Sequence, residues 1–216
     1  MPTRLLKAVL IVILLPLPGA HVPATAAPRP SGKSCAVTAM DVAKFWSLIE
    51  RTLPFEADTQ KQSEAMQKVL AELAPQEIEA FEVQFNQQLV RAYTWDLWGA
   101  TYVVHGGASD DAFEYFRRWL ISKGQRMFEH VLAKPDDLAD LVAVNVVGGL
   151  EFEEFAYIPR DVWVNRTKKS PDDFACGDYP AYPKSGPTGA PFEEDNDALA
   201  MRYPKLWKRF GDNPLM

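Results

Sequence analysis

The spacing of apolar residues from Thr38 onward is the feature that most restricts the fold. Apolar side chains recur at steps of three and four residues through several consecutive segments, which is the period of an amphipathic α-helix. No internal repeat and no convincing β-hairpin accompanies them. Hydrophobic residues make up 47% of the 216, which suffices for one core at this length. We therefore predict an all-α fold, a single compact multi-helix domain with a proline-rich loop and a short helical C-terminal extension.

Start and stop signals divide this domain into helices. Thr38 is predicted to cap a first helix that Pro54 closes, and a second helix follows over residues 58–73. Pro75 suits the first turn of a third helix of about 30 residues, with a bend near Thr94. Further helices are predicted at 109–124, 125–133, 135–142 and 150–164, a short strand at 144–147, and a start, kink or end at Pro159 in the last helix.

The first 26 residues are predicted to be a secretory signal peptide. Arg4 and Lys7 precede a nearly continuous apolar run over residues 8–17, and small residues lead to a cleavage position after Ala26. The apolar run is short for a transmembrane helix, and an uncleaved membrane anchor is the alternative. We expect a secreted or periplasmic protein without membrane contact once the signal is removed.

Export would place the two cysteines, Cys35 and Cys176, in an oxidising compartment. We predict a disulfide between them, with two free thiols as the alternative. Neither cysteine has a histidine nearby, which argues against a catalytic thiol. The predicted organisation is a signal peptide (1–26), a leader (27–37), a helical domain (38–165), a Pro/Gly-rich loop (166–194) and a C-terminal helical extension that packs on the domain (195–216).

Charge and motifs exclude several classes of function. The chain carries 29 acidic against 23 basic residues, and a nucleic-acid partner would need a basic surface. The sequence contains no H-E-x-x-H or G-x-S-x-G motif and no glycine loop that cradles phosphate. We predict no cofactor and no metal site.

The densest group of aromatic and polar side chains lies within residues 93–124. Gly106 and Gly107 allow two helices to meet at a sharp corner, and Ser109 is a good cap for the second helix. One interpretation is a corner that only braces helix packing. The other is a ligand-binding cleft, because aromatic walls with a few polar groups are typical of ligand sites. The candidate ligand-binding residues are Trp95, Trp98, His105, Ser109, Asp110, Asp111 and Arg117.

The same corner supports an alternative, a hydrolase-like or metal-dependent enzyme. His105 with Ser109 and the acidic pair could imitate a catalytic triad, and Glu151, Glu153 and Glu154 offer carboxylates for a metal ion. A hydroxyl that caps a helix is a poor nucleophile, and a charge run on a helix is usually a solvated face. The preferred hypothesis is a module that binds a protein or a small polar ligand, with the partner unknown.

The segment also carries a family resemblance. Residues 93–124 contain YxWxLWGAxYVxxGGxSDDxFxYFRxWLIxxG, and KPDDLA follows at 134–139. This pattern resembles the domain-of-unknown-function 4240 family of bacterial proteins over residues 40–165, and RYPKLWKRFG at 202–211 resembles the C-terminal end of that family. The resemblance implies a shared domain, and no established activity follows from it.

Overall fold

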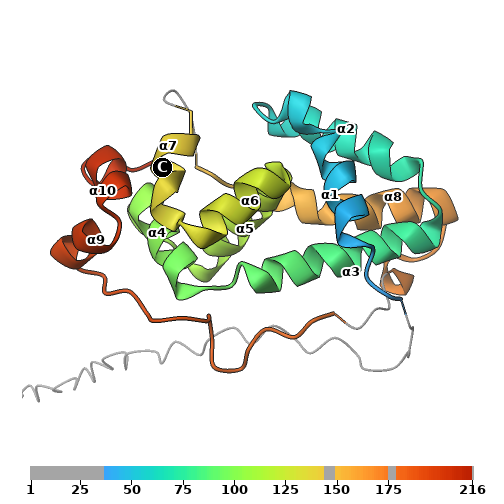
Figure 1. Cartoon of the computed structure of the whole chain (residues 1–216). Helices are drawn as coiled ribbons and strands as arrows, with labels where there is room; N and C mark the ends of the chain where they lie inside the picture. The colour runs from blue at the N-terminus through green and yellow to red at the C-terminus, as the bar shows by residue number, and fades with distance from the viewer. Residues whose placement is uncertain (1–36, 144–148, 175–178, 216) are drawn as a thin grey trace, which may run out of the picture. The chain divides into compact units, whose positions relative to one another are not determined.

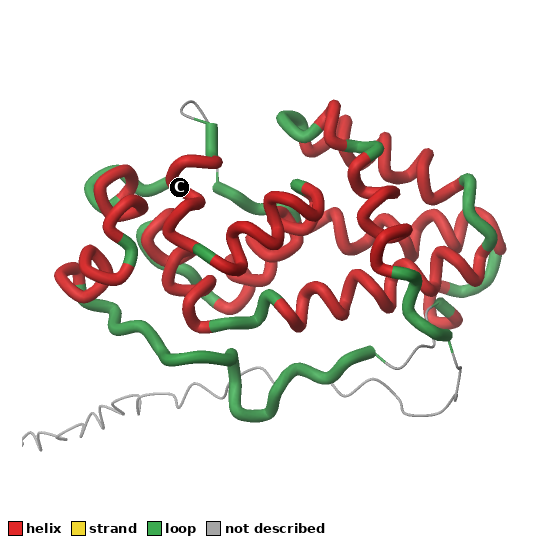
Figure 2. Tube along the Cα trace, viewed as in Figure 1, coloured by secondary structure: helices red, strands yellow, loops and turns green. Residues whose placement is uncertain are grey.

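The computed structural model describes residues 37–143, 149–174 and 179–215. Within these ranges the chain forms ten α-helices and four 3₁₀-helices and no strand (Figures 1 and 2). The predicted all-α compact domain is therefore confirmed. None of the helices in the described ranges is both long and apolar enough to cross a membrane.

Three sequence predictions fall on residues outside the described ranges. They are the signal peptide with nearly all of the leader, the strand at 144–147, and the disulfide between Cys35 and Cys176. All three remain predictions.

The first two helices are α1 (Val42–Glu50) and α2 (Thr59–Ala71), joined by the 3₁₀-helix η1 (Leu53–Phe55). The carboxylate of Asp41 caps α1 by accepting from the backbone N–H of the third helical residue at 3.0 Å. The predicted cap at Thr38 is therefore wrong. Asp41 supplies the same capping acceptor three residues later, and its charge also suits the positive end of the helix dipole.

The chain that follows forms two helices, α3 (Pro75–Arg91) and α4 (Trp95–His105), instead of the single long helix predicted. Thr94 is extended and its hydroxyl caps α4, which ends the run of helical backbone before it. Thr188 then bonds the peptide groups on either side of Thr94, donating to one at 3.0 Å and accepting from the other at 2.9 Å. The break is thus held by a local cap and by a distant segment.

A sharp corner separates α4 from α5 (Asp110–Ser122). Gly106 adopts the left-handed conformation with φ of 67°, and Gly107 has φ of 137°. The Ser109 hydroxyl accepts from the Ala112 N–H at 3.2 Å. Both the glycine corner and the serine cap are confirmed. Glycine adopts these backbone angles without steric cost.

Four short elements follow α6 (Gly124–Ala133). Pro159 lies in the first turn of the last of them, where its missing N–H costs no hydrogen bond, so the predicted helix from residue 150 starts late. The elements are η2 (Pro135–Asp137), α7 (Leu138–Leu141), η3 (Glu153–Tyr157) and α8 (Ile158–Thr167).

The C-terminal helices α9 (Asn196–Arg202) and α10 (Pro204–Phe210) form the predicted extension, and α10 packs on α4, η2 and α7 (Figure 1). The carboxylate of Asp136 accepts from the backbone N–H groups of Lys205 and Leu206 at 3.0 and 2.9 Å, so η2 caps α10. Tyr203 donates to the backbone carbonyl of Asp96 on α4 at 3.0 Å. The contacts of Asp136 thus join the KPDD segment to the RYPKLW segment.

The Pro/Gly-rich loop contains the short η4 (Pro171–Asp173) and then residues 179–194, which we call the strap. The strap runs past α3 and α4 to reach α9 (Figure 1). Thr188 attaches it to the α3–α4 break, and Phe192 packs on Trp95 with the ring centroids 6.1 Å apart. The loop is therefore extended, as predicted, and is bound to the helical body along its course.

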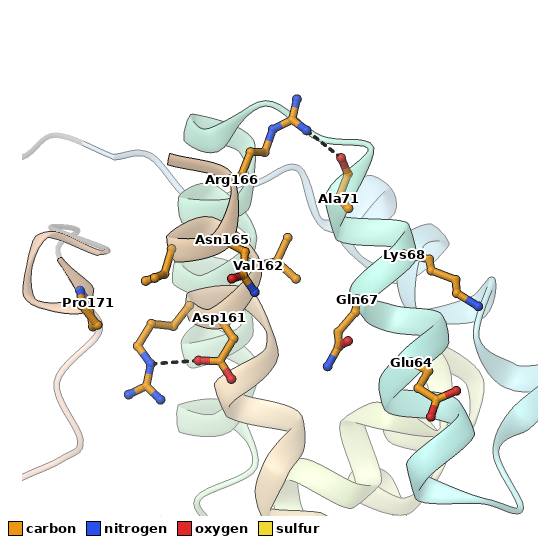
Figure 3. A pocket seen from close by; sticks show the side chains of 11 residues that line it. Glu64, Gln67, Lys68, Ala71, Asp161, Val162, Asn165, Arg166 and Pro171 are labelled. Atoms are coloured by element: carbon orange, nitrogen blue, oxygen red, sulfur yellow. Dashed lines mark hydrogen bonds and ion pairs between the residues drawn. The ribbon is translucent and has the colours of Figure 1, made fainter. Parts of the chain in front are cut away.

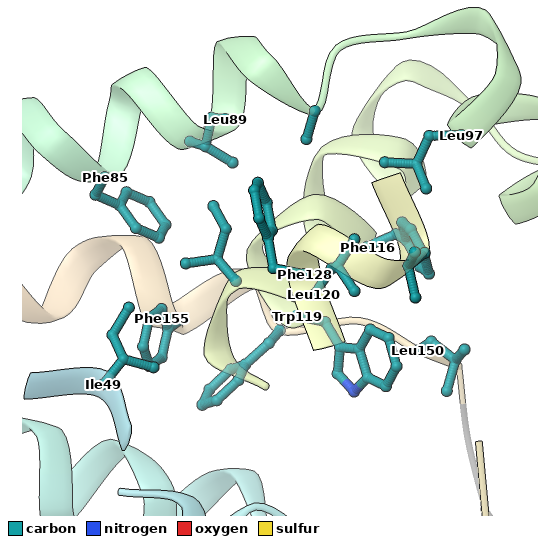
Figure 4. Packing of buried hydrophobic residues seen from close by; sticks show 14 of the residues in the cluster. Ile49, Phe85, Leu89, Leu97, Phe116, Trp119, Leu120, Phe128, Leu150 and Phe155 are labelled. Atoms are coloured by element: carbon teal, nitrogen blue, oxygen red, sulfur yellow. The ribbon is translucent and has the colours of Figure 1, made fainter. Parts of the chain in front are cut away.

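One apolar core joins these elements. Large side chains from α1, α3, α5, α6 and η3 meet at its centre (Figure 4). Trp46 and Trp163, predicted as core residues, are 1% and 2% exposed. The labelled members in Figure 4 include Ile49, Phe85, Leu89, Leu97, Phe116, Trp119, Leu120, Phe128, Leu150 and Phe155.

Candidate functional site

A pocket of about 250 Å³ lies at the corner between α4 and α5. Four aromatic rings and three charged groups line it, which is the composition expected of a small-ligand site. We call it the corner pocket, and its residues are Tyr93, Trp98, Asp110, Phe113, Glu114, Arg117 and Tyr182.

Helix α5 supplies four of these residues from a single face. Asp110, Phe113, Glu114 and Arg117 follow the i, i+3, i+4, i+7 spacing that puts side chains in one row along a helix. The cap at Ser109 fixes where this row begins. Phe113 and Arg117 are buried while Asp110 is exposed, so the row runs from the mouth of the pocket to its floor.

Aromatic rings form the walls. Trp98 stacks on Phe113 with the centroids 4.8 Å apart, and its indole N–H donates to the carbonyl of Ala108 at 3.0 Å. Tyr93 meets Tyr182 of the strap edge to face at 4.9 Å. Burial raises the pKa of Tyr93, with a smaller opposing effect of Arg117, so the hydroxyl stays neutral at neutral pH. The walls are thus aromatic and partly supplied by the strap.

Arg117 forms the floor of the corner pocket and is only 3% exposed. Its Nη1 donates to the backbone carbonyl of Leu89 at 2.8 Å and to the Tyr182 hydroxyl at 3.0 Å. The guanidinium carbon lies 4.8–5.3 Å from the ring centroids of Phe113, Tyr93 and Tyr182. No carboxylate among the described residues forms an ion pair with it, and its Nε has no hydrogen-bond partner there.

The neighbouring Arg118 is a natural reference because it is also buried on α5. Its Nη2 forms an ion pair with Glu114, and its Nη1 donates to the carbonyl of Glu153 at 2.8 Å. Its Nε, like that of Arg117, has no described partner, so an orphan Nε alone does not distinguish a site. The distinguishing features of Arg117 are its uncompensated charge and its position on a pocket. A buried charge without a counter-ion is costly, and proteins seldom keep one without a use for it.

Three other predicted site residues lie around the pocket without lining it. Trp95 stacks on the outer side of Trp98 at 5.3 Å and supports that wall. The Ser109 hydroxyl is occupied as the cap of α5, and Asp111 lies in the first turn of that helix. Of the seven predicted residues, the pocket therefore brings together Trp98, Asp110 and Arg117.

His105 faces the sealed side of the corner. Its side chain is 7% exposed, and Nε2 accepts from the backbone N–H of Leu150 at 3.0 Å. The nearest carboxylate oxygen, on Glu151, is 4.0 Å from Nδ1. Burial lowers the pKa of His105 to about 4, so the ring is neutral at neutral pH.

The residues of the enzymatic alternative are not assembled at the corner pocket. His105 is bonded to Leu150, and Ser109 to its own helix. No group of three or more His, Cys, Asp or Glu side chains in the described part of the chain has the arrangement of a metal site. Glu153, one of the carboxylates considered for a metal ion, accepts from the Tyr157 hydroxyl at 2.7 Å. The Tyr157 ring lies against Arg118.

A second, larger hollow lies between α2 and α8, with a volume of about 1190 Å³ (Figure 3). Its charged side chains are exposed. Arg166 donates to the carbonyl of Ala71 at 3.0 Å, and Arg160 pairs with Asp161 at 3.5 Å. Among the residues that the structure describes, no buried polar side chain lines it. The groove therefore lacks the uncompensated group that distinguishes the corner pocket.

One known protein family matches the chain. A family model described as "Protein of unknown function (DUF4240)" matches residues 40–165, more than half of the chain. The chain belongs to this family. The match confirms the predicted family and its predicted range. No curated protein and no solved structure matches the chain.

The matched DUF4240 domain contains six of the seven corner-pocket residues, and the strap supplies the seventh, Tyr182. Sequence reasoning missed four of the seven. The i, i+3, i+4 spacing from Asp110 along α5 would have identified Phe113 and Glu114. No local signal points to Tyr182, which is 65 residues from Arg117.

Proposed function

We propose that this DUF4240 protein is a binding module that holds a small polar ligand in the corner pocket. The observation that carries the proposal is Arg117, a buried guanidinium without a counter-ion among the described residues, on the floor of an aromatic pocket. The side-on edge of a guanidinium, formed by Nε and Nη2, is the edge that binds a carboxylate in a bidentate manner. Both described hydrogen bonds of Arg117 leave from Nη1, and its buried Nε has no hydrogen-bond partner among the described residues.

The size of the pocket favours a small molecule over a protein partner. Its volume of about 250 Å³ is at the lower end for ligand sites, and its aromatic walls provide apolar contact on several sides. A ligand with an anionic group would neutralise the Arg117 charge, and the low local dielectric would strengthen that interaction. Tyr182, on the strap, lines this pocket and is 41% exposed.

A ligand screen followed by matched variants tests this proposal. The purified chain is first screened by thermal shift against amino acids, peptides, organic acids, amines, sugars and nucleosides, since specific binding raises the melting temperature. Affinities of the hits are then measured by calorimetry for wild type, Arg117→Lys and Arg118→Lys. Lysine keeps the charge but loses the planar fork.

We expect Arg117→Lys to weaken binding about tenfold or more, and Arg118→Lys to leave it within about twofold. Urea unfolding without ligand checks that both variants remain folded. Hits that bind Arg117→Lys as tightly as wild type, or a screen without any hit, would refute the corner pocket as the binding site.

We also propose that the protein is exported and that Cys35 and Cys176 form a disulfide. Support comes from the sequence pattern of residues 1–26 and from the even pair of cysteines. Intact mass analysis of material from the native host tests both proposals at once. Loss of the first 26 residues without alkylatable thiols is the expected result, whereas an uncleaved chain with two alkylatable thiols would contradict both.

A further inference from the structure

We infer that the ligand of the corner pocket is an extended zwitterion, a short peptide or an amino acid whose ammonium and carboxylate groups lie several ångströms apart. The inference rests on the proposed function and adds the chemical class of the ligand. It follows from how opposite charges are placed along the pocket.

The two ends of the pocket carry opposite charges. Arg117 is buried at the floor, and Asp110 is exposed at the mouth. They are seven positions apart on the same face of α5, a backbone rise of about 10 Å, and the Arg117 guanidinium reaches back to lie 4.8 Å from the Phe113 ring. A ligand that runs from floor to mouth would meet a cation first and an anion last.

Asp110 is the carboxylate available to a ligand. The other pocket carboxylate, Glu114, is already paired with Arg118. Asp110 forms no ion pair with any residue in the described ranges. An ammonium group at the mouth would therefore gain a partner there without displacing an existing bond.

The walls between the charged ends favour an aromatic or apolar ligand middle. Trp98 is stacked between Trp95 and Phe113, so Trp98 and Phe113 offer ring edges to the pocket, and Tyr93 and Tyr182 form an edge-to-face pair. Aromatic walls of this kind favour contact with an apolar or aromatic group. The charged ends and the apolar middle together describe a dipeptide with an aromatic side chain or an ω-amino acid.

Three matched probes separate the two charges of the ligand. Glycyl-phenylalanine carries both, its N-acetyl derivative lacks the ammonium, and its amide lacks the carboxylate. Aminohexanoate, hexanoate and hexylamine form a second series without an aromatic ring. Calorimetry with the full chain gives the affinity of each compound for wild type, Asp110→Asn and Asp111→Asn.

We expect each zwitterion to bind wild type about threefold to tenfold more tightly than the matched acid, because the second ion pair lies at a partly exposed mouth. Asp110→Asn should remove this preference while leaving the affinity for the acid unchanged. Asp111→Asn changes the net charge equally but lies outside the pocket, so it should keep the preference.

Two outcomes would overturn the inference. If acids bind as tightly as zwitterions and Asp110→Asn has no effect, the zwitterion inference is wrong while the proposed binding function stands. If amines bind as tightly as zwitterions and binding is insensitive to Arg117→Lys, the proposed function fails together with the inference.

Discussion

Arg117 and Arg118 are adjacent in sequence, yet they belong to two very different regions of the molecule. Arg118 forms an ion pair with Glu114 and lies against the Tyr157 ring, so this cation has a carboxylate partner. Arg117 lies on the face of α5 that borders the corner pocket, without a described counter-ion. Both guanidinium groups contact aromatic rings, so burial and cation–π contacts do not separate the two regions.

The difference separates structural charges from charges available for binding. A buried cation that is fully paired stabilises one arrangement of helices and has little left to offer a ligand. A buried cation without a counter-ion lowers stability, and a ligand that supplies the missing charge recovers part of that cost. Substitutions at the corner, on its closed side and in the Arg118 ion pair test this difference.

The largest effect on stability is expected from Gly106→Val, at the turn between α4 and α5. Valine is strained at a φ of 67°, and its Cβ would lie 2.8 Å from the Cγ of Pro214. We expect a loss of about 3 kcal/mol in the free energy of unfolding, measured by urea denaturation.

Gly107→Val is the matched control for this turn. Gly107 also has a positive φ, of 137°, but a Cβ added there would have no described atom within 4 Å. We expect a smaller loss of about 1–2 kcal/mol, from backbone strain alone. Wild-type stability in both variants would show that the corner does not depend on its glycines.

The free energy of unfolding should depend on pH through His105, which is buried at the corner. Since the folded-state pKa of His105 is about 4 and its ordinary value is 6.5, the unfolded chain binds the proton more readily. The stability from the neutral ring is complete above pH 6.5 and is lost as the pH falls toward 4. Between pH 7 and pH 5 we expect wild type to lose about 1–2 kcal/mol more than His105→Asn.

His105→Asn retains an acceptor for the Leu150 N–H and removes the titration. Comparing the two pH profiles by urea denaturation cancels the contribution of the other ionisable groups, including Glu151. Parallel pH profiles would contradict this prediction, because they would mean that the His105 ring is hydrated in the folded protein and that burial does not lower its pKa.

A smaller difference in stability is expected between variants of the two acidic residues of the pocket. Glu114→Gln breaks the ion pair with the buried Arg118 and should cost about 1 kcal/mol. Asp110→Asn removes only a favourable charge near the start of α5 and should cost about 0.3 kcal/mol. Equal losses in thermal unfolding would indicate that Asp110 has a structural partner.

The sequence predicted most of the architecture because helix periodicity and capping are local. The start of the second helix near Asp58, the cap at Ser109 and the glycine turn all follow from residues within one helical turn. The bend predicted near Thr94 is a full break between two helices, and its extent was not predicted because it depends partly on Thr188, a residue from the distant strap. Helix ends that are fixed by tertiary contacts leave no periodic signal.

The candidate site was predictable only in part, for the same reason. Asp110, Trp98 and Arg117 were chosen as polar or aromatic members of one dense segment, and the pocket does contain them. His105 belongs to the same segment but points to the opposite side of the corner, where Leu150 bonds it. Proximity in sequence does not fix which face of a corner a side chain occupies.

The most direct measurement follows the guanidinium signals themselves. In a ¹⁵N-labelled chain, the Nε–H resonances of Arg117 and Arg118 are assigned from the spectra of Arg117→Lys and Arg118→Lys, and glycyl-phenylalanine is then titrated. We predict that the Arg117 signal shifts and saturates with the calorimetric affinity while the Arg118 signal stays in place. Binding that leaves the Arg117 signal unmoved, or that shifts Arg118 instead, would contradict the assignment of the ligand site to the corner pocket.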